Sequence, residues 1–315
     1  MSLHLLADAP KTIPAPSVSY HDLAPILIVI GAALLGVLAE ALVPRAERYA
    51  AQVTISLAGL VAAGISVAEL HGTNETTVKG ALAIDSAGLF MQGTIVALAI
   101  MSVLLVAERT VDDRSPIVAS ASVVVGSPRD QELSRTDRMQ TEIFPMLLFA
   151  VSGMLIFTVS NNLILMFVAL EVMSLPLYLM AGLSRRRRLQ SQEAALKYFL
   201  LGAFASAFFL YGLAMLYGYA NSVDLPVILD AARTSSKPDV LLYVGLALLL
   251  VGLLFKAGIA PFHSWTPDVY QGSPTSVTAF MASYTKVAAF GAILRVLYVG
   301  FNTTAWNWRP VIWAV

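Results

Sequence analysis

The 315-residue sequence contains no cysteine and few charged residues. Without a thiol, the chain itself cannot form a disulfide, a thiolate metal site or a cysteine-ligated iron–sulfur cluster. Charged residues make up 13% of the chain, about half of the roughly 25% found in soluble domains. Hydrophobic residues make up 57%. This composition leaves too little polar surface for a water-soluble globule, so we expect the lipid bilayer to be the main solvent.

Net charge and recognisable cofactor motifs are missing as well. The formal net charge is zero, which gives no electrostatic basis for a nucleic-acid partner. The four histidines lie far apart, at positions 4, 21, 71 and 263, and do not form a haem or zinc set. No Walker sequence, no HExxH and no GxGxxG after a strand is present. We therefore expect no cofactor and no metal in this chain, and any redox centre it serves must lie on other chains.

Long apolar windows are what the sequence does have. Windows of about 20 residues, the length that crosses a hydrocarbon core about 30 Å thick, predict eight spanning helices at about 24–43, 51–70, 84–107, 143–160, 162–183, 193–219, 240–268 and 275–299, with a ninth beginning near Pro310. In lipid a helix satisfies its own backbone polar groups, and these runs lack the alternation of a barrel strand. The predicted fold is an all-α, polytopic transmembrane protein.

Between and around these spans the sequence divides into five regions. We expect an outer N-terminal segment (1–23), three helices (24–107), a polar cytoplasmic loop (108–142), a five-helix unit (143–299), and a final loop with the start of a ninth helix (300–315).

The basic residues of the loops predict an orientation. One side holds eleven: Arg45, Arg48, Arg109, Arg114, Arg129, Arg135, Arg138 and Arg185–Arg188. The other side holds five: Lys11, Lys79, Arg233, Lys237 and Arg309. Cytoplasmic loops carry the excess of Lys and Arg, so the N-terminus is expected outside a cell inner (plasma) membrane. The run at 185–188 is interpreted as a topological signal that also meets anionic lipid, with a partner-binding role left open.

Four ionisable residues lie inside predicted spans: Glu171, Lys197, Lys256 and Lys286. A charged side chain at the centre of a membrane helix costs roughly 2.5–3.5 kcal/mol on insertion scales. Such groups must face a wet interior or one another, which makes them candidates for a proton relay. A static buried ion pair that fixes helix packing is the alternative.

Two of the basic residues near span ends have a simpler interpretation. Lys197 lies about one turn into its span, where it can snorkel to the headgroups or pair with Glu193 at i,i+4. Arg295, near the outer end of the eighth span, is expected to be a snorkelling anchor rather than a site residue.

The seventh span contains a predicted helix break. The apolar stretch runs for about 29 residues, and Gly258 and Pro261 interrupt it just after Lys256. Proline removes a backbone hydrogen bond and clashes with the preceding turn, and transporters place ions at breaks of this kind. A plain proline kink is the alternative. His263 follows the break, and we leave open whether it packs structurally or transfers protons.

A lysine relay has definite physical requirements. A free lysine has a pKa of about 10.4 and holds its proton too tightly to pass it on near neutral pH. Burial and a nearby second cation destabilise the charged form, whereas a nearby carboxylate stabilises it. A carboxylate that moves toward and away from a buried lysine would therefore switch proton binding, and Glu171 is the residue we expect to play that part.

Three stretches resemble a known membrane family. NNLILMFVALEVMSLPLYLM contains Glu171, EAALKYFLLGAFASAFFLYGLAMLYG contains Lys197, and FKAGIAPFHSWTPDVYQGSPTSVTAFMASYTKVAAF contains Lys256 and Lys286. They resemble the fifth, the sixth, and the broken seventh and eighth helices of the antiporter-like, proton-pumping membrane subunits of respiratory complex I. The LKYF start of the sixth helix and the stretch ASYTKVAAF in the eighth favour the N branch of this family over the L and M branches, which tend to carry histidine near the eighth-helix lysine. Here Ser283 and Tyr284 occupy those positions.

The resemblance implies an architecture, partners and a function. The family is built of two inverted five-helix repeats, and residues 143–299 correspond to the first; the second would lie beyond Val315. Implied partners are the subunits M, L, K, J and A, with FMN, iron–sulfur clusters and quinone on other subunits. The implied function is proton translocation coupled to quinone reduction, making the chain a non-redox subunit of a translocase.

Other functions remain open at this point. A subunit of a multi-subunit sodium/proton antiporter, or of a related membrane-bound redox complex, shares the same intramembrane charges. A purely structural role, in which the buried charges fix helix register, is a third possibility. Transport that depends on sodium but not on NADH would favour the antiporter, and variants that harm assembly before activity would favour the structural role.

Overall fold

The computed structural model describes residues 18–108, 117, 123–124, 126–128, 131–132, 140–184, 188–234 and 238–315. Most of the expected loop 108–142, Arg185–Arg187 of the arginine run and the first 17 residues of the expected N-terminal segment therefore lie outside the described residues.

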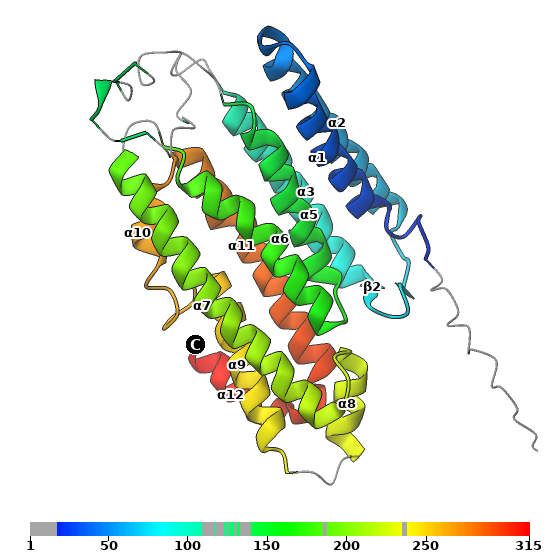
Figure 1. Ribbon diagram of the computed structural model, residues 1–315. Helices are drawn as coiled ribbons and strands as arrows, with labels where there is room; N and C mark the ends of the chain where they lie inside the picture. The colour runs from blue at the N-terminus through cyan, green and yellow to red at the C-terminus, as the bar shows by residue number, and fades with distance from the viewer. Residues whose placement is uncertain are drawn as a thin grey trace, which may run out of the picture.

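The described chain is a bundle of long helices that run up and down beside one another (Figure 1). The long helices are α1 (Ala24–Leu42), α2 (Arg45–Glu69), α3 (Ser86–Ala107), α5 (Ile143–Val159), α6 (Leu163–Ala181), α7 (Arg188–Ala220), α9 (Val240–Ala257) and α11 (Thr275–Arg295). Among the described residues, seven helices are long and apolar enough to cross a membrane, and the apolar α5 has 17 residues. The predicted all-α polytopic fold is confirmed.

Short elements connect the long helices. They are α8 (Leu225–Thr234), α10 (Thr266–Gly272), the π-helical turn η1 (Val296–Gly300), the 3₁₀ turn η2 (Asn302–Thr304) and α12 (Ala305–Ala314). A small antiparallel hairpin, β1 (Glu75–Thr77) with β2 (Leu82–Ile84), joins α2 to α3. The last helix begins at Ala305, earlier than the predicted Pro310, because Asn307 and Arg309 lower the local hydropathy on which the prediction relied.

The break in the seventh span is present. α9 ends at Ala257, and Gly258 caps it with a φ of 66°, a left-handed conformation that glycine adopts without steric cost. Its amide donates to the carbonyl of Phe255 at 3.0 Å. The chain then continues without an α-helix until α10 begins at Thr266. The predicted broken helix is confirmed, and the break places the ends of α9 and α10 beside α11.

Close packing of α7 against α9 fixes the neighbourhood of this break. A Cβ atom added at Gly212 of α7 would lie 2.6 Å from the carbonyl oxygen of Gly245 and 2.6 Å from the amide nitrogen of Leu249, both in α9. Small residues let membrane helices approach to backbone contact. This packing fixes α9 on α7, and the side chain of Lys256, in the last turn of α9, reaches Ser174 of α6 and Tyr198 of α7.

Candidate functional site

Lys256 is a buried cation surrounded by neutral groups. It lies in the last turn of α9 and is 4% exposed. Its ammonium donates to Ser174 Oγ at 2.8 Å and to Tyr198 Oη at 3.2 Å. It also lies 5.3 Å from the ring centre of Tyr198 and 5.8 Å from that of Tyr178. Within the part of the chain that the structure describes, no carboxylate lies at ion-pair distance from it.

Glu171 lies one helical turn from the hydroxyl group that binds Lys256. Glu171 and Ser174 are three residues apart on α6 and so share a face. The Glu171 carboxylate accepts a hydrogen bond from Ser206 Oγ of α7, not from a lysine. Lys256 binds Ser174, three residues after Glu171 on the same helix. The acid and the amine are thus neighbours without direct contact.

Lys286 lies on the other side of the helix break. It is half-buried on α11, and its ammonium is 5.4 Å from the ring centre of Trp265 and 5.8 Å from that of Tyr270. Gly258 leaves room for it, because a Cβ atom there would clash with Lys286 Nζ. The residue also lines a cavity of about 490 Å³ between α3 and α11, together with Phe90, Met91, Thr94, Ala257, Ile259, Val287 and Phe290.

A row of four aromatic rings links the two lysines. Tyr178 of α6 meets Tyr198 of α7 edge to face at 4.6 Å, and Tyr198 stacks on Trp265 at 4.8 Å with an angle of 7° between the planes. Trp265 in turn meets Tyr270 of α10 at 5.9 Å. Lys256 lies over the first two rings and Lys286 over the last two. The faces of aromatic rings attract cations, so the row holds both ammonium groups without neutralising either.

The sequence interpretation did not identify these aromatic residues. Tyr198 lies in LKYF, directly after Lys197, and Trp265 and Tyr270 lie in HSWTPDVY. Aromatic residues are common in membrane helices, and the spacing along the chain does not show that they form one row. The only available signal was their position within the stretches that carry the lysines.

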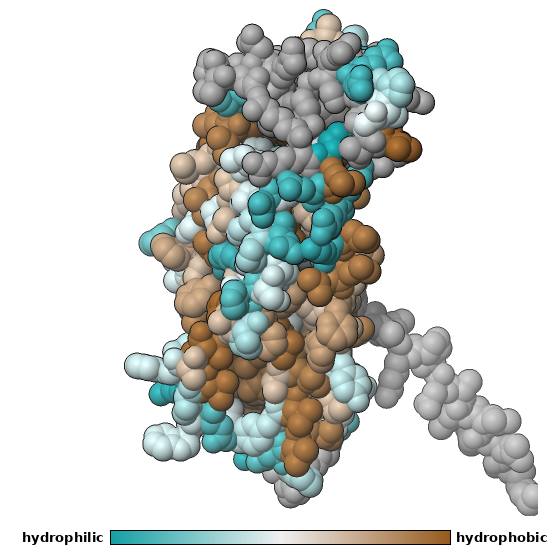
Figure 2. All heavy atoms as spheres, turned by 90° about the vertical axis from the view of Figure 1, so that its left-hand side faces the viewer, coloured by the Kyte–Doolittle hydropathy of each residue, from teal (hydrophilic) through white to brown (hydrophobic). Residues whose placement is uncertain are grey.

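Lys197 is separate from this buried group. It is 41% exposed, and its ammonium forms ion pairs with Glu193 at 2.7 Å and with Asp268 of α10 at 2.6 Å. The structure shows the i,i+4 pair with Glu193 that the sequence suggested, and adds Asp268, which the sequence interpretation missed. Figure 2 shows hydrophilic side chains interrupting the apolar surface on this side of the molecule, and Gln190, Glu193, Lys197, Asp268 and Gln271 line a cavity of about 120 Å³ there.

His263 is also outside the buried group. It lies in the segment between α9 and α10 and is exposed. Its backbone carbonyl accepts from the Thr266 amide at 2.9 Å and from Thr266 Oγ1 at 2.7 Å. Among the described residues, its imidazole has no hydrogen-bond or ion-pair partner. The structure therefore brings Glu171, Lys256 and Lys286 together and leaves Lys197 and His263 on the surface near α10.

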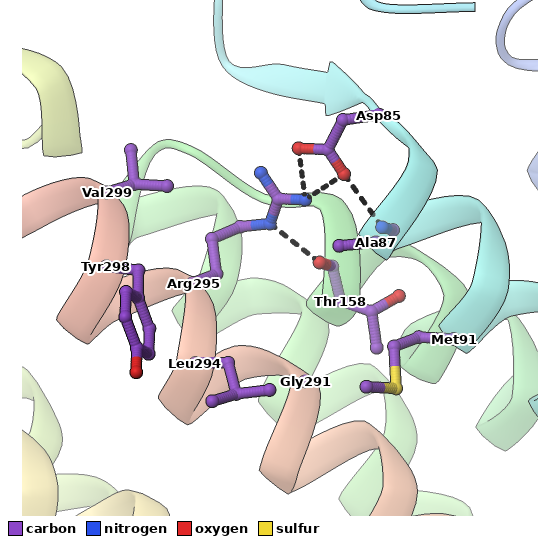
Figure 3. A pocket seen from close by; sticks show the side chains of 10 residues that line it. Asp85, Ala87, Met91, Thr158, Gly291, Leu294, Arg295, Tyr298 and Val299 are labelled. Carbon is purple, nitrogen blue, oxygen red and sulfur yellow. Dashed lines mark hydrogen bonds and ion pairs between the residues drawn. The ribbon is translucent and has the colours of Figure 1, made fainter. Parts of the chain in front are cut away.

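The prediction that Arg295 is a snorkelling anchor is wrong. Its side chain is 5% exposed and points at Asp85, at the start of α3 (Figure 3). Nη2 donates to both carboxylate oxygens of Asp85, at 2.8 and 2.9 Å, while Nη1 donates to Asn161 Oδ1 and Nε to the carbonyl of Thr158. Asp85 lies 210 residues away in the sequence, so only the tertiary structure reveals the partner that makes burial possible.

Asp85 also caps a helix. Its Oδ1 also accepts from the Gly88 amide at 2.7 Å and so caps the N-terminus of α3. The pair lines a pocket of about 260 Å³ with Met91, Gly291, Leu294 and Tyr298 among its walls (Figure 3). This second charged group joins the start of α3 to the end of α11. Among the described residues, no group of three or more His, Asp or Glu is placed to hold a metal ion.

Comparison with protein families gives a match over the second half of the chain. Residues 160–315 match the family described as NADH:quinone oxidoreductase/Mrp antiporter, TM. This segment contains Glu171, Lys197, Lys256 and Lys286.

Curated relatives match nearly the whole chain. A protein from Parafrankia sp. named NADH-quinone oxidoreductase subunit N is 56% identical over 99% of this chain and 59% of its own length. A protein of the same name from Acidothermus cellulolyticus is 55% identical over 100% of this chain and 61% of its own length. The chain thus spans less than two thirds of the length of these relatives.

Solved structures show the same arrangement of helices. A chain of respiratory complex I from Thermus thermophilus with bound Aureothin is 36% identical, with a TM-score of 0.68 over 86% of this chain and 53% of that chain. A chain of the Mrp complex from Dietzia sp. has a TM-score of 0.70 over 91% of this chain and 50% of that chain. It is 21% identical and supports the fold alone.

Proposed function

We propose that this chain is a member of the NADH:quinone oxidoreductase/Mrp antiporter membrane family and that it carries protons in the membrane part of an NADH–quinone oxidoreductase. The observation that carries the proposal is the state of Lys256. It is 4% exposed and bound by neutral hydroxyl groups and rings, whereas a group that serves only to fix packing gains most from a directly bound counter-charge. A buried cation held in this way is suited to gaining and losing a proton.

Glu171 would act as the switch. Its carboxylate is bound to Ser206 and lies one turn from Ser174, which binds Lys256. Movement from the first serine toward the second would bring a negative charge to the ammonium and stabilise the protonated lysine. Return to Ser206 would remove that stabilisation and favour release of the proton.

Lys286 would be the next group in the relay. It lies at the far end of the aromatic row, whose two ends carry the two ammonium groups. A proton arriving at one of the two lysines therefore disfavours a proton on the other, because like charges repel. His263, exposed near α10, would exchange protons with the water-facing side, and Lys197 would do so when Glu193 and Asp268 move away from it, because both carboxylates stabilise its charged form.

Redox chemistry would remain on other subunits. In this proposal FMN, the iron–sulfur clusters and quinone are bound by partner chains, and this chain is a non-redox part of the translocase. The partners would be the subunits M, L, K, J and A of the complex, within the bacterial inner membrane. The named relatives, 52–56% identical, support this assignment.

The orientation is also part of the proposal. α2 and α7 both begin, and α3 ends, at the upper end of the bundle in Figure 1. Arg45 and Arg48 lie in the first turn of α2, and Arg188 begins α7. Because cytoplasmic ends carry the excess of basic residues, we place this end in the cytoplasm and the N-terminus outside.

Replacement of Lys256 tests the function. In inverted membrane vesicles that contain the complete complex, Lys256→Met should reduce NADH-driven proton uptake to the background level, because Met has a similar length but no ionisable group. The amount of assembled complex, measured on native gels, should not change. Lys79→Met is the matched control, since Lys79 is exposed in the turn of the β1–β2 hairpin, and it should pump normally.

Two results would contradict the proposal. Normal proton uptake by an assembled Lys256→Met complex would show that this lysine carries no protons in the coupled reaction. Ion transport by the wild-type complex that requires sodium and proceeds without NADH would instead favour the sodium/proton antiporter.

A further inference from the structure

Helices α7 and α10 meet at two contacts that lie side by side along α7. On the surface, Lys197 of α7 pairs with Asp268 of α10 at 2.6 Å. Inside, the next residue, Tyr198, stacks on Trp265, which immediately precedes α10, at 4.8 Å. Trp265 and Asp268 are three residues apart, so one short segment supplies both partners. We propose that Asp268 is a positioning residue, whose ion pair with Lys197 holds α10 on α7 and keeps Trp265 stacked on Tyr198 beside Lys256.

The stack that depends on this tether reaches the buried lysine directly. Tyr198 accepts a hydrogen bond from Lys256 Nζ at 3.2 Å, and its ring lies between Tyr178 and Trp265 in the aromatic row. Trp265 is also held by Phe255 of α9, whose backbone carbonyl accepts its indole N–H at 3.0 Å. Movement of α10 away from α7 would therefore change the surroundings of both lysines, Lys256 through Tyr198 and Lys286 through Trp265.

α10 needs such a tether because it is short. It has 7 residues, and a helix of this length is not stable by itself because nucleation is unfavourable. The segment before it, from Gly258 to Trp265, contains no α-helix. Tertiary contacts must therefore hold α10 in place, and Asp268 makes the charged contact with α7.

The packing at the other end of α10 shows how closely the two helices approach. A Cβ atom added at Gly272 would lie 2.5 Å from the carbonyl oxygen of Gln190 and 2.6 Å from Ala194 Cβ, both in α7. Asp268 and Gly272 are one turn apart on α10. The ion pair and the glycine contact thus fasten the same face of α10 to successive turns of α7.

Glu193 provides the matched control. It pairs with the same ammonium at 2.7 Å, but it lies on the same helix as Lys197. Glu193→Gln and Asp268→Asn each remove one negative charge from Lys197, yet only the second cuts the link between two helices. If the two variants differ in labelling or in transport, the cause is therefore the lost link between α7 and α10, and not the lost negative charge near Lys197.

A cysteine placed next to α10 measures the tether without any transport. Ser273 follows α10 and is 8% exposed, and these 315 residues contain no cysteine. Maleimide labelling of the Ser273→Cys protein, after subtraction of the labelling of the same protein without this substitution, therefore reports that position. Asp268→Asn should increase its labelling rate severalfold, and Glu193→Gln should leave the rate unchanged. Asp268→Glu, which keeps the charge, should restore slow labelling. Equal labelling rates in Asp268→Asn and Glu193→Gln would show that the ion pair between Asp268 and Lys197 does not hold α10 on α7.

Transport in the same complexes tests the positioning role, which rests on the proposed function. Asp268→Asn should lower proton uptake per NADH oxidised severalfold, and Asp268→Glu should recover most of it. Faster labelling with unchanged uptake would overturn the positioning role. If Lys256→Met pumps normally, the proposed function fails, but the labelling comparison still decides whether Asp268 tethers α10. If Lys256→Met stops pumping and Asp268→Asn behaves like Glu193→Gln, only this inference fails.

Discussion

Lys256 and Arg295 are both buried cations, and they are stabilised in different ways. Arg295 is bound by the Asp85 carboxylate, by Asn161 and by a backbone carbonyl, so most of its donors are satisfied in one fixed geometry. Lys256 is bound by two hydroxyl groups and lies over aromatic rings, with Glu171 close by but hydrogen-bonded to Ser206. The charge of Arg295 is neutralised by a directly bound carboxylate, and the charge of Lys256 is not.

In the function proposed above, this difference separates a structural charge from a transferable one. Guanidinium does not deprotonate in proteins, and its planar fork fits a carboxylate; a bound Arg–Asp pair is therefore a static connection. An amine is able to lose its proton when burial destabilises its charge. Arg295 joins two distant helix ends, whereas Lys256 lies at a helix break near Glu171, which is bound to Ser206. The following variants test this distinction, in order of decreasing effect.

The largest effect is expected from breaking the fixed pair. Arg295→Met leaves Asp85, whose side chain is 30% exposed, without its partner, and should destabilise the chain by about 3 kcal/mol, the lower end of the range for breaking a buried ion pair. The amount of the chain in assembled complex on native gels, and the midpoint of its thermal unfolding, should both fall. Lys256→Met should change neither.

A neutral pair sharpens this test. Asp85→Asn together with Arg295→Met removes both charges and should recover part of the lost assembly, since a buried pair contributes less than the cost of leaving one charge alone. If Arg295→Met assembles as well as Lys256→Met, the two cations do not differ in the way proposed.

An intermediate effect is expected at the helix break. Gly258→Ala forces a Cβ atom into a left-handed conformation, at a cost of about 1–2 kcal/mol, and brings it against Lys286 Nζ. Proton uptake should fall because the ammonium must move away from the Trp265 and Tyr270 rings. Both the thermal midpoint and the proton uptake should be measured.

Gly218→Ala is the control for this variant. Gly218 lies within α7 with no atom within 4 Å of an added Cβ, and alanine should stabilise a helix there by about 0.5–1 kcal/mol. Equal behaviour of the two variants would show that the space at Gly258 does not matter for Lys286.

The smallest effect is expected from removing one hydroxyl group beside Lys256. Tyr198→Phe keeps the ring stacked on Trp265 but removes an acceptor of Lys256, a loss of about 1 kcal/mol for one hydrogen bond. Assembly should not change, and proton uptake should decrease by a small factor. Tyr219→Phe, also in α7 and equally buried, loses its bond to Asp239 far from the lysines and should pump normally. Equal uptake in both variants would remove Tyr198 from the relay.

Much of the fold could be predicted because the bilayer makes hydropathy decisive. Apolar stretches such as 24–43 and 275–299 coincide closely with α1 and with α11 continued by η1. The break after Lys256 was predictable from Gly258 and Pro261, since both act on the local backbone. The start of α12 was misplaced, because polar residues on a helix hide it from a hydropathy window.

The partners of the charged residues could not be predicted in the same way. The sequence identified Glu171, Lys256 and Lys286 as buried, but it gave no means to see that Ser174, Tyr198 and Trp265 surround the lysines. Arg295 is the clearest case. Its position near the end of a span suggested an exposed side chain, but the side chain is buried because it binds Asp85 at the start of another helix.

The sequence alone determined that the chain is a bundle of membrane helices, and at which residues charge enters the hydrocarbon region. Both properties depend on a residue and its immediate neighbours, since transfer into lipid and backbone hydrogen bonding within a helix are local. The tertiary structure decided which charges are neutralised, which are held by neutral groups, and that Asp268 links α10 to α7. Those outcomes depend on helix rotation and close packing, which bring together residues that lie up to 210 positions apart in the sequence.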